Sequence, residues 1–284
     1  GVLCLKIHFI SDTQVVVEDA SDFDLSETFD CGQCFRWNQI SENEFEGVAF
    51  ERVVKILKEK NKVVLKGTSV SSDFASIWRG YFDLDTDYNT IKSNLAKLDY
   101  NLNLACKYAP GIHILRQEPW ETLCSFIISQ NNNIPRIKGI VERLSSSFGC
   151  EIEHGFFSFP LSSRLANLDK SDLAPLRCGF RDEYILDAAK KVSSGEVDFE
   201  KIRSLPITEA RNELMKIKGV GPKVAECTLL YGFHRLEAFP VDVWMRRALS
   251  TFFPGKDISY FGKYAGIAQQ YIFHYSRMNP DLVK

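Results

Sequence analysis

The chain has 284 residues and a formal net charge of −2, from 35 Lys and Arg against 37 Asp and Glu. Hydrophobic residues make up 45% and charged residues 25%, as in an ordinary soluble globular protein with room for two or three domains. No run of about 18 apolar residues is present, which excludes a membrane-spanning helix, and GVLCLKIHF at the start lacks the apolar stretch of a signal peptide. We expect a protein of the bacterial cytoplasm and nucleoid, or of the nucleus in a eukaryote.

The N-terminal part of the chain is predicted to be rich in strands. Its apolar runs are short, β-branched or aromatic, and separated by polar turns. Four of them stand out: TQVVVED at 13–19, EFEGVAF at 44–50, ERVVKILKE at 51–59 and NKVVLKG at 61–67. A helix is then predicted within 83–99, where Asp and Thr are available as N-caps. We expect an antiparallel β-rich domain over residues 1–107.

From residue 108 the apolar residues recur at steps of three and four, which predicts helices. The clearest stretches are 120–130, 134–149, 181–195, 207–217, 224–233 and 264–276. We therefore expect a helical region over 108–284, and an α+β protein overall. No internal repeat or low-complexity linker interrupts the chain.

Charge divides unevenly between these two parts. Residues 1–107 carry 12 Lys and Arg against 17 Asp and Glu, whereas residues 108–284 carry 23 against 20. A polyanion should therefore meet the second part, through a local basic patch.

The eight cysteines give little support for a metal site. They are scattered along the chain, and in a reducing compartment they should be thiols. Cys31 and Cys34 form one CxxC pair, without a second pair at the spacing of a zinc site.

A glycine-rich turn, GVGPK at 219–223, joins two of the predicted helices. Gly219 and Gly221 allow a tight turn and a close approach to another surface, and Pro222 suits the first turn of a helix. Backbone N–H groups at such a helix start can bind phosphate. From the turn alone, an ordinary helix–helix connection with Lys223 on a solvated face explains the pattern equally well.

Lys223 and Asp242 favour a functional site over an ordinary helix–helix connection. Lys223 lies in the first turn of its helix, where the helix dipole disfavours positive charge, and an amine nucleophile needs to be uncharged. Asp242 precedes the helical run VWMRRALSTFF at 243–253, so it is expected to be an N-cap. A carboxylate there could also stabilise a cation that develops on a sugar.

The pattern L-x-x-I-x-G-V-G-P-K-V-A at 214–225, followed by P-V-D at 240–242, resembles the helix-hairpin-helix signature of the base-excision DNA glycosylases. Three further blocks, CGQCFRW at 31–37, SQNNNIPRI at 129–137 and YAGIAQQYIF at 264–273, resemble the 8-oxoguanine DNA glycosylases within that superfamily. The resemblance implies an N-terminal sheet like that of TATA-binding protein and a hairpin at about 207–233. Its partner would be double-stranded DNA containing 8-oxoguanine.

The resemblance also implies an activity. The enzyme would flip the damaged nucleotide, excise its base and then nick the strand by β-elimination. Lys223 would be the nucleophile that forms a Schiff base, and Asp242 would stabilise the sugar cation. Neither a metal nor another cofactor is implied. A cation bound by hairpin carbonyls, as in some relatives, is left open.

Eight further residues match positions of the family that contact DNA. Phe273 and Cys227 would sandwich the flipped base, Gln269 would read its Watson–Crick edge, and the Gly32 carbonyl would accept from the N7–H of the oxidised purine. Asn131 would fill the vacated space, Phe180 would be the wedge beside it, and Arg136 and Arg181 would bond the opposite cytosine.

Two positions depart from the eukaryotic pattern. Trp244 stands where a histidine contacts phosphate, and Tyr231 replaces a methionine of the pocket, which together suggest a bacterial or divergent subgroup. No cysteine follows Cys227, which excludes the C-terminal iron–sulfur cluster of other relatives.

Two other functions compete with this hypothesis. One is a glycosylase of the same superfamily for another lesion, such as an alkylated purine, against which Gly32, Gln269 and Phe273 argue. The other is a noncatalytic helix-hairpin-helix module, which would need neither Lys223 nor Asp242. In each case we expect a monomer that does not bind membranes.

Overall fold

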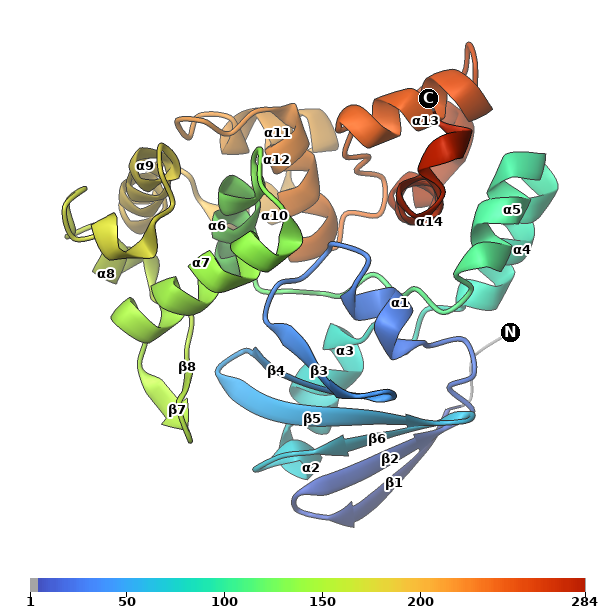
Figure 1. Ribbon diagram of the computed structural model, residues 1–284, viewed down its shortest axis with the longest axis horizontal. Coiled ribbons are helices and arrows are strands. Elements are labelled where there is room, and N and C mark those ends of the chain that lie inside the picture. The colour runs from blue at the N-terminus through green and yellow to red at the C-terminus, as the bar shows by residue number, and fades with distance from the viewer. Residues whose placement is uncertain (1–4, 284) are drawn as a thin grey trace.

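The computed structural model describes residues 5–283 (Figure 1). Near the N-terminus, six antiparallel strands form one sheet in the order β1-β2-β6-β5-β4-β3. Their bounds are β1 Lys6–Ser11, β2 Gln14–Glu18, β3 Trp37–Ser41, β4 Glu44–Ala49, β5 Arg52–Glu59 and β6 Lys62–Lys66. The predicted antiparallel β-rich part is confirmed.

The four predicted strands are β2, β4, β5 and β6, which form the middle of the sheet. Their alternate residues, such as Val15, Val17 and Phe45, are fully buried. The two strands that the sequence did not predict, β1 and β3, lie at the edges of the sheet. Most of their residues are exposed, so neither shows the apolar alternation by which a strand is recognised.

Short helices cover one face of this sheet and complete its hydrophobic core (Figure 1). They are α1 Leu25–Phe29, α2 Val70–Asp73, the π-helix η1 Phe74–Trp78 and α3 Arg79–Tyr81. Trp37 stacks on Phe29 with ring centroids 4.3 Å apart, and its indole N–H donates to the hydroxyl of Tyr81 at 2.7 Å. This aromatic cluster fixes the segment that connects α1 to β3.

The rest of the chain is helical, apart from a short hairpin of β7 Glu151–Glu153 and β8 Phe156–Phe157. The longer helices are α4 Tyr88–Leu98, α5 Tyr100–Tyr108, α6 Pro119–Ser129, α7 Ile134–Phe148, α9 Arg181–Ser193, α11 Ile207–Leu214, α13 Val243–Phe252 and α14 Ala265–Met278. The shorter ones are α8 Ser162–Leu165, η2 Ala174–Leu176, α10 Phe199–Ser204, α12 Pro222–Cys227, η3 Thr228–Gly232, η4 Ile258–Tyr264 and η5 Pro280–Leu282. Every predicted helical stretch contains a helix.

Hydrophobic packing does not divide the chain at one point. Residues of α4 and α5, including Ile91 and Leu102, belong to the core of the helical region, whereas Leu115 belongs to the core of the sheet. Figure 1 shows α4 and α5 beside α14, the last long helix. The domain boundary at residue 107 stays a prediction.

The α1–β3 connection joins the two parts. Gln33 is fully buried and bonds backbone groups of Thr28, His113 and Leu115 at 2.8–2.9 Å. Farther along, Arg36 pairs with Glu121 of α6 at 3.3 Å. The connection is therefore held from both sides and carries Gly32 into the helical region.

Within residues 5–283, no helix is long and apolar enough to cross a membrane. The seven cysteines in that range are free thiols, as expected, and Cys4 lies outside the described residues.

Candidate active site

The predicted helix-hairpin-helix consists of α11, the glycine turn and α12. Gly219 has a φ of +76°, and a Cβ there would lie 2.2 Å from Cδ2 of Tyr184, so only glycine fits. Gly221 has extended backbone, and a Cβ there would face open space. The start of α12 is thus uncovered at this point, and an anion could approach its backbone N–H groups.

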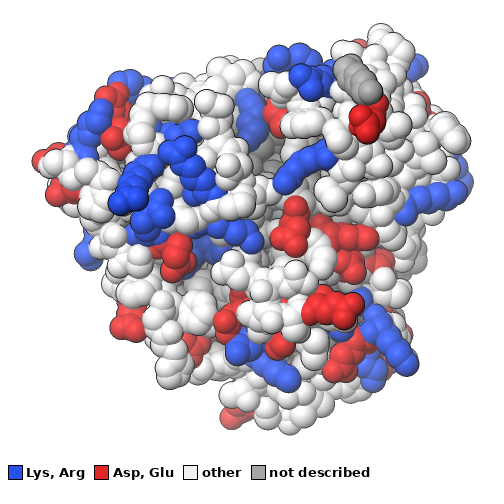
Figure 2. All heavy atoms as spheres, viewed as in Figure 1, with Lys and Arg blue, Asp and Glu red and all other residues white. Residues whose placement is uncertain are grey.

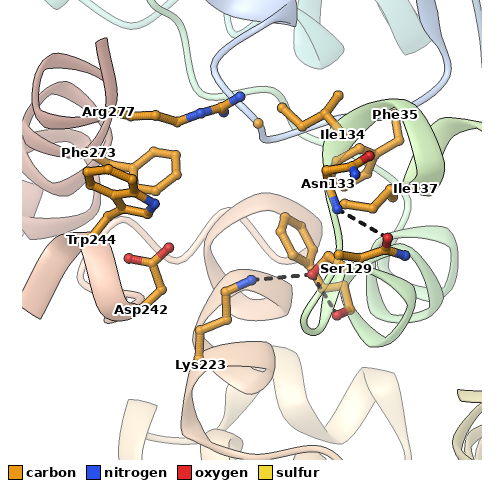
Figure 3. A pocket seen from close by; sticks show the side chains of 13 residues that line it. Phe35, Ser129, Asn133, Ile134, Ile137, Lys223, Asp242, Trp244, Phe273 and Arg277 are labelled. Atoms are coloured by element: carbon orange, nitrogen blue, oxygen red, sulfur yellow. Dashed lines mark hydrogen bonds between the residues drawn. The ribbon is translucent and has the colours of Figure 1, made fainter. Parts of the chain in front are cut away.

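Lys223 extends from the first turn of α12 into a cavity. Its amine donates to Oγ of Ser129 at 3.3 Å and lies 4.9 Å from the ring centroid of Phe126. Both partners belong to α6, so the amine spans the gap between the hairpin and α6 (Figure 3). The structure therefore does not place Lys223 on a solvated outer face.

Asp242 lies on the other side of the same cavity. As predicted, it is the N-cap of α13, and its Oδ1 accepts from the backbone N–H of Met245 at 2.8 Å. Figure 3 shows its carboxylate and the Lys223 amine pointing into one space. An amine and a carboxylate are thus available to act on one bound group.

A buried carboxylate, which sequence reasoning missed, fixes the relative position of these two residues. Glu226 of α12 pairs with Arg211 of α11, and its second oxygen accepts from the backbone N–H of Phe239 at 2.7 Å. Phe239 lies three residues before Asp242 in the chain. One side chain therefore joins both helices of the hairpin to the segment that carries Asp242.

The cavity has an outer and an inner part. The outer part has a volume of about 300 Å³, and Asn132, Asn133, Trp244 and Arg277 are among its lining residues. The inner part, of about 40 Å³, is lined by Gly32, Cys227, Tyr231, Gln269 and Phe273 among others. Lys223 and Asp242 line both parts. The four residues predicted to recognise the base thus lie together, next to the predicted catalytic pair.

The inner part is almost closed. A volume of about 40 Å³ holds roughly one water molecule, so a purine base could enter only after side chains move. Phe273 is only partly buried, whereas Cys227 and Gln269 are 3% exposed. Movement of Phe273 is thus the simplest way to open the space.

The side-chain amide of Gln269 has an unpaired acceptor in the inner part of the cavity. Its Oε1 atom is buried and has no partner within residues 5–283. Buried polar atoms are normally paired, because leaving one unpaired costs about 1–3 kcal/mol. The amide is therefore suited to a ligand that brings a donor.

Cys227 contributes a neutral wall to the inner part. Burial raises the pKa of its thiol to about 11, although the nearby Lys223 amine lowers it in part. At neutral pH the thiol is protonated and is a poor nucleophile.

Gly32 faces the cavity from the α1–β3 connection. Its φ is +89°, and a Cβ there would lie 3.5 Å from Nη1 of Arg277 and 3.7 Å from Cε1 of Phe273. Arg277, which sequence reasoning also missed, reaches across the cavity mouth in Figure 3. It follows Phe273 by one helical turn, so the periodicity of α14 could have revealed it.

The residues predicted to contact the opposite strand form a second group, at the turn between α6 and α7. Asn131 is exposed at the tip of this turn and has a φ of +48°. Phe180 is 51% exposed, as predicted, and lies under the guanidinium of Arg181 at 4.5 Å. Arg136 is exposed in the first turn of α7.

The guanidinium of Arg181 is less available for binding a DNA base than the sequence suggests. It is 3% exposed and bonds the carbonyls of Gln130, Asn131 and Cys178. Burial and the nearby Arg136 lower the pKa of its guanidinium. In this structure it holds the Asn131 turn in place, and it could reach a base only by giving up some of these bonds.

Basic side chains surround this turn. Arg136 and Arg143 of α7 bond carbonyls of Arg177 and Leu176, which brings three arginines together. Figure 2 shows Lys and Arg gathered on the side of α7 and α9, whereas basic and acidic side chains are mixed over the sheet. The predicted charge asymmetry is therefore visible on the surface, as a local patch that suits a polyanion.

A lysine at the start of the second hairpin helix, facing a capping aspartate across one cavity, is the arrangement of a DNA glycosylase of the helix-hairpin-helix class. Two family models match the chain. Residues 15–123 match the 8-oxoguanine DNA glycosylase N-terminal domain, and residues 124–260 match the HhH-GPD superfamily of base excision DNA repair proteins.

Individual proteins agree with these models. The chain is 34% identical to the N-glycosylase/DNA lyase of Saccharomyces cerevisiae over 254 residues, which cover 80% of this chain and 67% of that one. Two solved structures, each bound to DNA, match 98% of this chain. They are MBOgg1 with a low-affinity DNA ligand (43% identity, TM-score 0.93, 100% of that chain) and the Clostridium acetobutylicum 8-oxoguanine glycosylase/lyase with cytosine opposite 8-oxoguanine (35%, 0.90, 99%). The chain belongs to the 8-oxoguanine DNA glycosylase family.

The role of Glu226 can be tested with Glu226→Gln. The amide can still accept from Phe239 but loses the charge that pairs with Arg211. We expect the free energy of unfolding to fall by about 1–3 kcal/mol, and base excision to slow because the segment before Asp242 loosens. Chemical denaturation and single-turnover excision measure the two effects.

Glu200→Gln, which removes an 83% exposed partner of Arg203, is the control and should change stability by less than about 0.5 kcal/mol. Equal effects of the two substitutions would contradict the assignment.

Proposed function

We propose that this protein excises 8-oxoguanine from duplex DNA and then cuts the strand at the abasic site. One observation carries the proposal. Lys223 and Asp242 lie on opposite sides of one cavity, and Gly32 and the unpaired oxygen of Gln269 lie at its inner end. The family to which the chain belongs supports the same activity.

The chemistry starts at the sugar. The uncharged amine of Lys223 attacks C1′ as the bond from C1′ to the base breaks, and the base leaves with the electron pair. The carboxylate of Asp242 stabilises positive charge on the sugar during this step. The nitrogen then loses a proton, its lone pair displaces O4′ as the C1′–O4′ bond breaks, and O4′ takes up a proton. The ring is now open, and an iminium ion joins Lys223 to C1′.

Strand cleavage follows from the iminium ion. Its charge acidifies the hydrogens on C2′, so a base can remove one of them. The bond between C3′ and oxygen then breaks, and the electron pair leaves with the 3′ phosphate. The amine itself supplies the electron sink for this step.

Base selection is proposed to depend on the inner part of the cavity. Cys227 and Phe273 sandwich the flipped base, Gln269 bonds its Watson–Crick edge, and the Gly32 carbonyl accepts from N7–H. Guanine has an acceptor at N7, so two acceptors would face each other at a cost of roughly 1–3 kcal/mol. That amounts to about tenfold to a hundredfold, so other steps must contribute to discrimination.

DNA positioning is proposed to depend on the second group of residues and the hairpin. Asn131 occupies the space of the flipped nucleotide, Phe180 stacks beside it, and Arg136 bonds the opposite cytosine. Arg181 supports the turn and bonds the same cytosine once its own hydrogen bonds rearrange. Phosphates bind at the Gly219–Gly221 turn. Arg277 adds a cation at the cavity mouth, where Trp244 offers only one N–H.

All these residues come from one chain, so we propose a monomer. Because its substrate is DNA, we place it in the nucleoid of a bacterium or the nucleus of a eukaryote.

The first prediction for this function concerns the lesion. Single-turnover excision of 8-oxoguanine should be at least about tenfold faster than excision of an alkylated purine from the same duplex, because only the oxidised base offers a donor to Gly32. Comparable rates would instead support a glycosylase for alkylated bases.

The second prediction concerns the base opposite the lesion. Arg136 offers donors that suit the acceptors of cytosine and clash with the amino group of adenine. Arg136→Ala should therefore reduce the preference for cytosine over adenine by about tenfold, as measured by excision from the two duplexes. Arg143→Ala removes a charge from the same helix and should weaken binding to both duplexes equally. If Arg136→Ala discriminated as sharply as the parent protein, this assignment would be wrong.

The third prediction concerns the nucleophile. Borohydride should trap a covalent adduct between the protein and 8-oxoguanine DNA, and Lys223→Gln should abolish both trapping and strand cleavage. It should retain lesion binding at fixed salt, because the hairpin backbone is unchanged. Lys218→Gln, which removes an exposed partner of Glu183 from the same turn, should still be trapped. An adduct with the Lys223→Gln variant would place the nucleophile elsewhere, and loss of binding would indicate a structural lysine.

A further inference from the structure

The acceptor assigned to N7–H is a backbone carbonyl, so no substitution at Gly32 can supply or remove it. Its position depends on what holds the peptides around it. No donor within residues 5–283 bonds the Gly32 carbonyl, whereas both neighbouring carbonyls are bonded. The Gly32 carbonyl is thus the one acceptor of this short segment that is left for a ligand.

Two glutamines, the buried Gln270 and the half-buried Gln117, hold the two neighbouring carbonyls. Nε2 of Gln270 donates to the carbonyl of Cys31 at 3.1 Å, and Nε2 of Gln117 donates to the carbonyl of Gln33 at 2.7 Å. The Gln33 side chain is itself bonded within the α1–β3 connection. The Gly32 carbonyl belongs to the Gly32–Gln33 peptide. The peptides on either side of it, Cys31–Gly32 and Gln33–Cys34, are each held by one of these glutamine bonds.

Tyr231 fixes the Gln270 side chain. The Tyr231 hydroxyl donates to Oε1 of Gln270, which is 1% exposed, so this bond and the bond to Cys31 together orient the amide. The Tyr231 ring is also buried and stacks on Phe126, with centroids 5.4 Å apart and planes 18° apart. Phe126 in turn lies beneath the Lys223 amine. A continuous chain of contacts therefore runs from the nucleophile, through Tyr231 and Gln270, to the Cys31–Gly32 peptide.

We infer that Tyr231 and Gln270 are positioning residues that set the discrimination between 8-oxoguanine and guanine, by fixing the Cys31–Gly32 peptide, which precedes the peptide that carries the Gly32 carbonyl. The inference rests on the proposed function. A Gly32 carbonyl held between fixed neighbours bonds N7–H well and repels the N7 acceptor of guanine, whereas looser neighbours would let it turn away from guanine and relieve the repulsion. Rigidity, not the mere presence of the carbonyl, makes the contact selective.

The experiment measures equilibrium binding in the Lys223→Gln background, so that the bound lesion is not excised. Dissociation constants at one salt concentration are compared for duplexes with 8-oxoguanine, guanine or a stable abasic analogue opposite cytosine. Tyr231→Phe removes only the hydroxyl, and Gln270→Met removes both amide contacts at similar volume. Tyr271→Phe is the matched control, because it removes another buried tyrosine hydroxyl that bonds a carbonyl, that of Ile112, at 3.2 Å.

Tyr231→Phe should reduce the ratio of guanine to 8-oxoguanine dissociation constants by about threefold to tenfold, the effect of one buried hydrogen bond. Gln270→Met should reduce it at least as much, and the double variant no more than Gln270→Met alone, because both residues act through one bond to Cys31. Binding of the abasic analogue should not change. Tyr271→Phe should lower thermal stability to a similar extent but leave the ratio unchanged.

Each other outcome has a distinct meaning. If the parent protein prefers 8-oxoguanine and Tyr231→Phe leaves the ratio of dissociation constants unchanged, the inference is wrong but the proposed function stands. An equal loss of ratio in Tyr271→Phe would also overturn it, since general loosening would then explain the effect. A parent protein without preference for 8-oxoguanine would overturn the proposed function and the inference with it.

Discussion

The buried carboxylate of Glu226 is the contact on which the geometry of the active site depends. It bonds one helix of the hairpin through Arg211 and the segment before Asp242 through the N–H of Phe239. Lys223 lies one helical turn before Glu226, and Asp242 three residues after Phe239. A charged group of this kind is stable in the interior only while its partners are in place. The contact therefore couples formation of the hairpin to the relative placement of Lys223 and Asp242, the proposed catalytic pair. It explains why these two residues can lie far apart in the sequence.

The sheet contributes to the site through one connection, not through its surface. Gly32 lies between α1 and β3, where buried glutamines and the aromatic cluster of Trp37 and Phe29 restrict the backbone. Two further bonds cross to the helical region, from Arg36 to Glu121 and from Lys138 to the carbonyl of Trp37 at 2.6 Å. Burial raises the pKa of the Glu121 carboxyl, and the Arg36 guanidinium opposes that shift. The strand-rich part can thus act as a rigid support that presents one carbonyl to a pocket made mostly of helices.

Local signals in the sequence predicted the features that depend on local physics. The central strands alternate apolar and polar residues, Asp242 precedes a helical run and caps it, and Phe180 stands at a helix start and is exposed. Features that depend on contacts between distant segments were missed. Nothing near Glu226 or Gln270 in the chain reveals that one bonds Phe239 and the other Cys31. Arg181 shows the same limit, because its donors bind the carbonyls of a turn that lies 50 residues away in the chain.

In the proposed function, two acceptors in the inner cavity recognise different parts of the base. The unpaired oxygen of Gln269 suits a base with donors on its Watson–Crick edge, which guanine and 8-oxoguanine share. It can therefore select a guanine-like base but cannot detect oxidation. In the proposed complex, the Gly32 carbonyl would face the edge where N7 is a donor in one base and an acceptor in the other. It could then detect oxidation, but it would not distinguish the rest of the base. An unpaired buried acceptor raises the free energy of the free protein. A base with donors on its Watson–Crick edge and at N7 would pair the acceptor of Gln269 and the carbonyl of Gly32 together. In the proposed function, guanine would satisfy the first acceptor and oppose the second, so opening of the closed pocket, about 40 Å³ in volume, would be more favourable around the oxidised base.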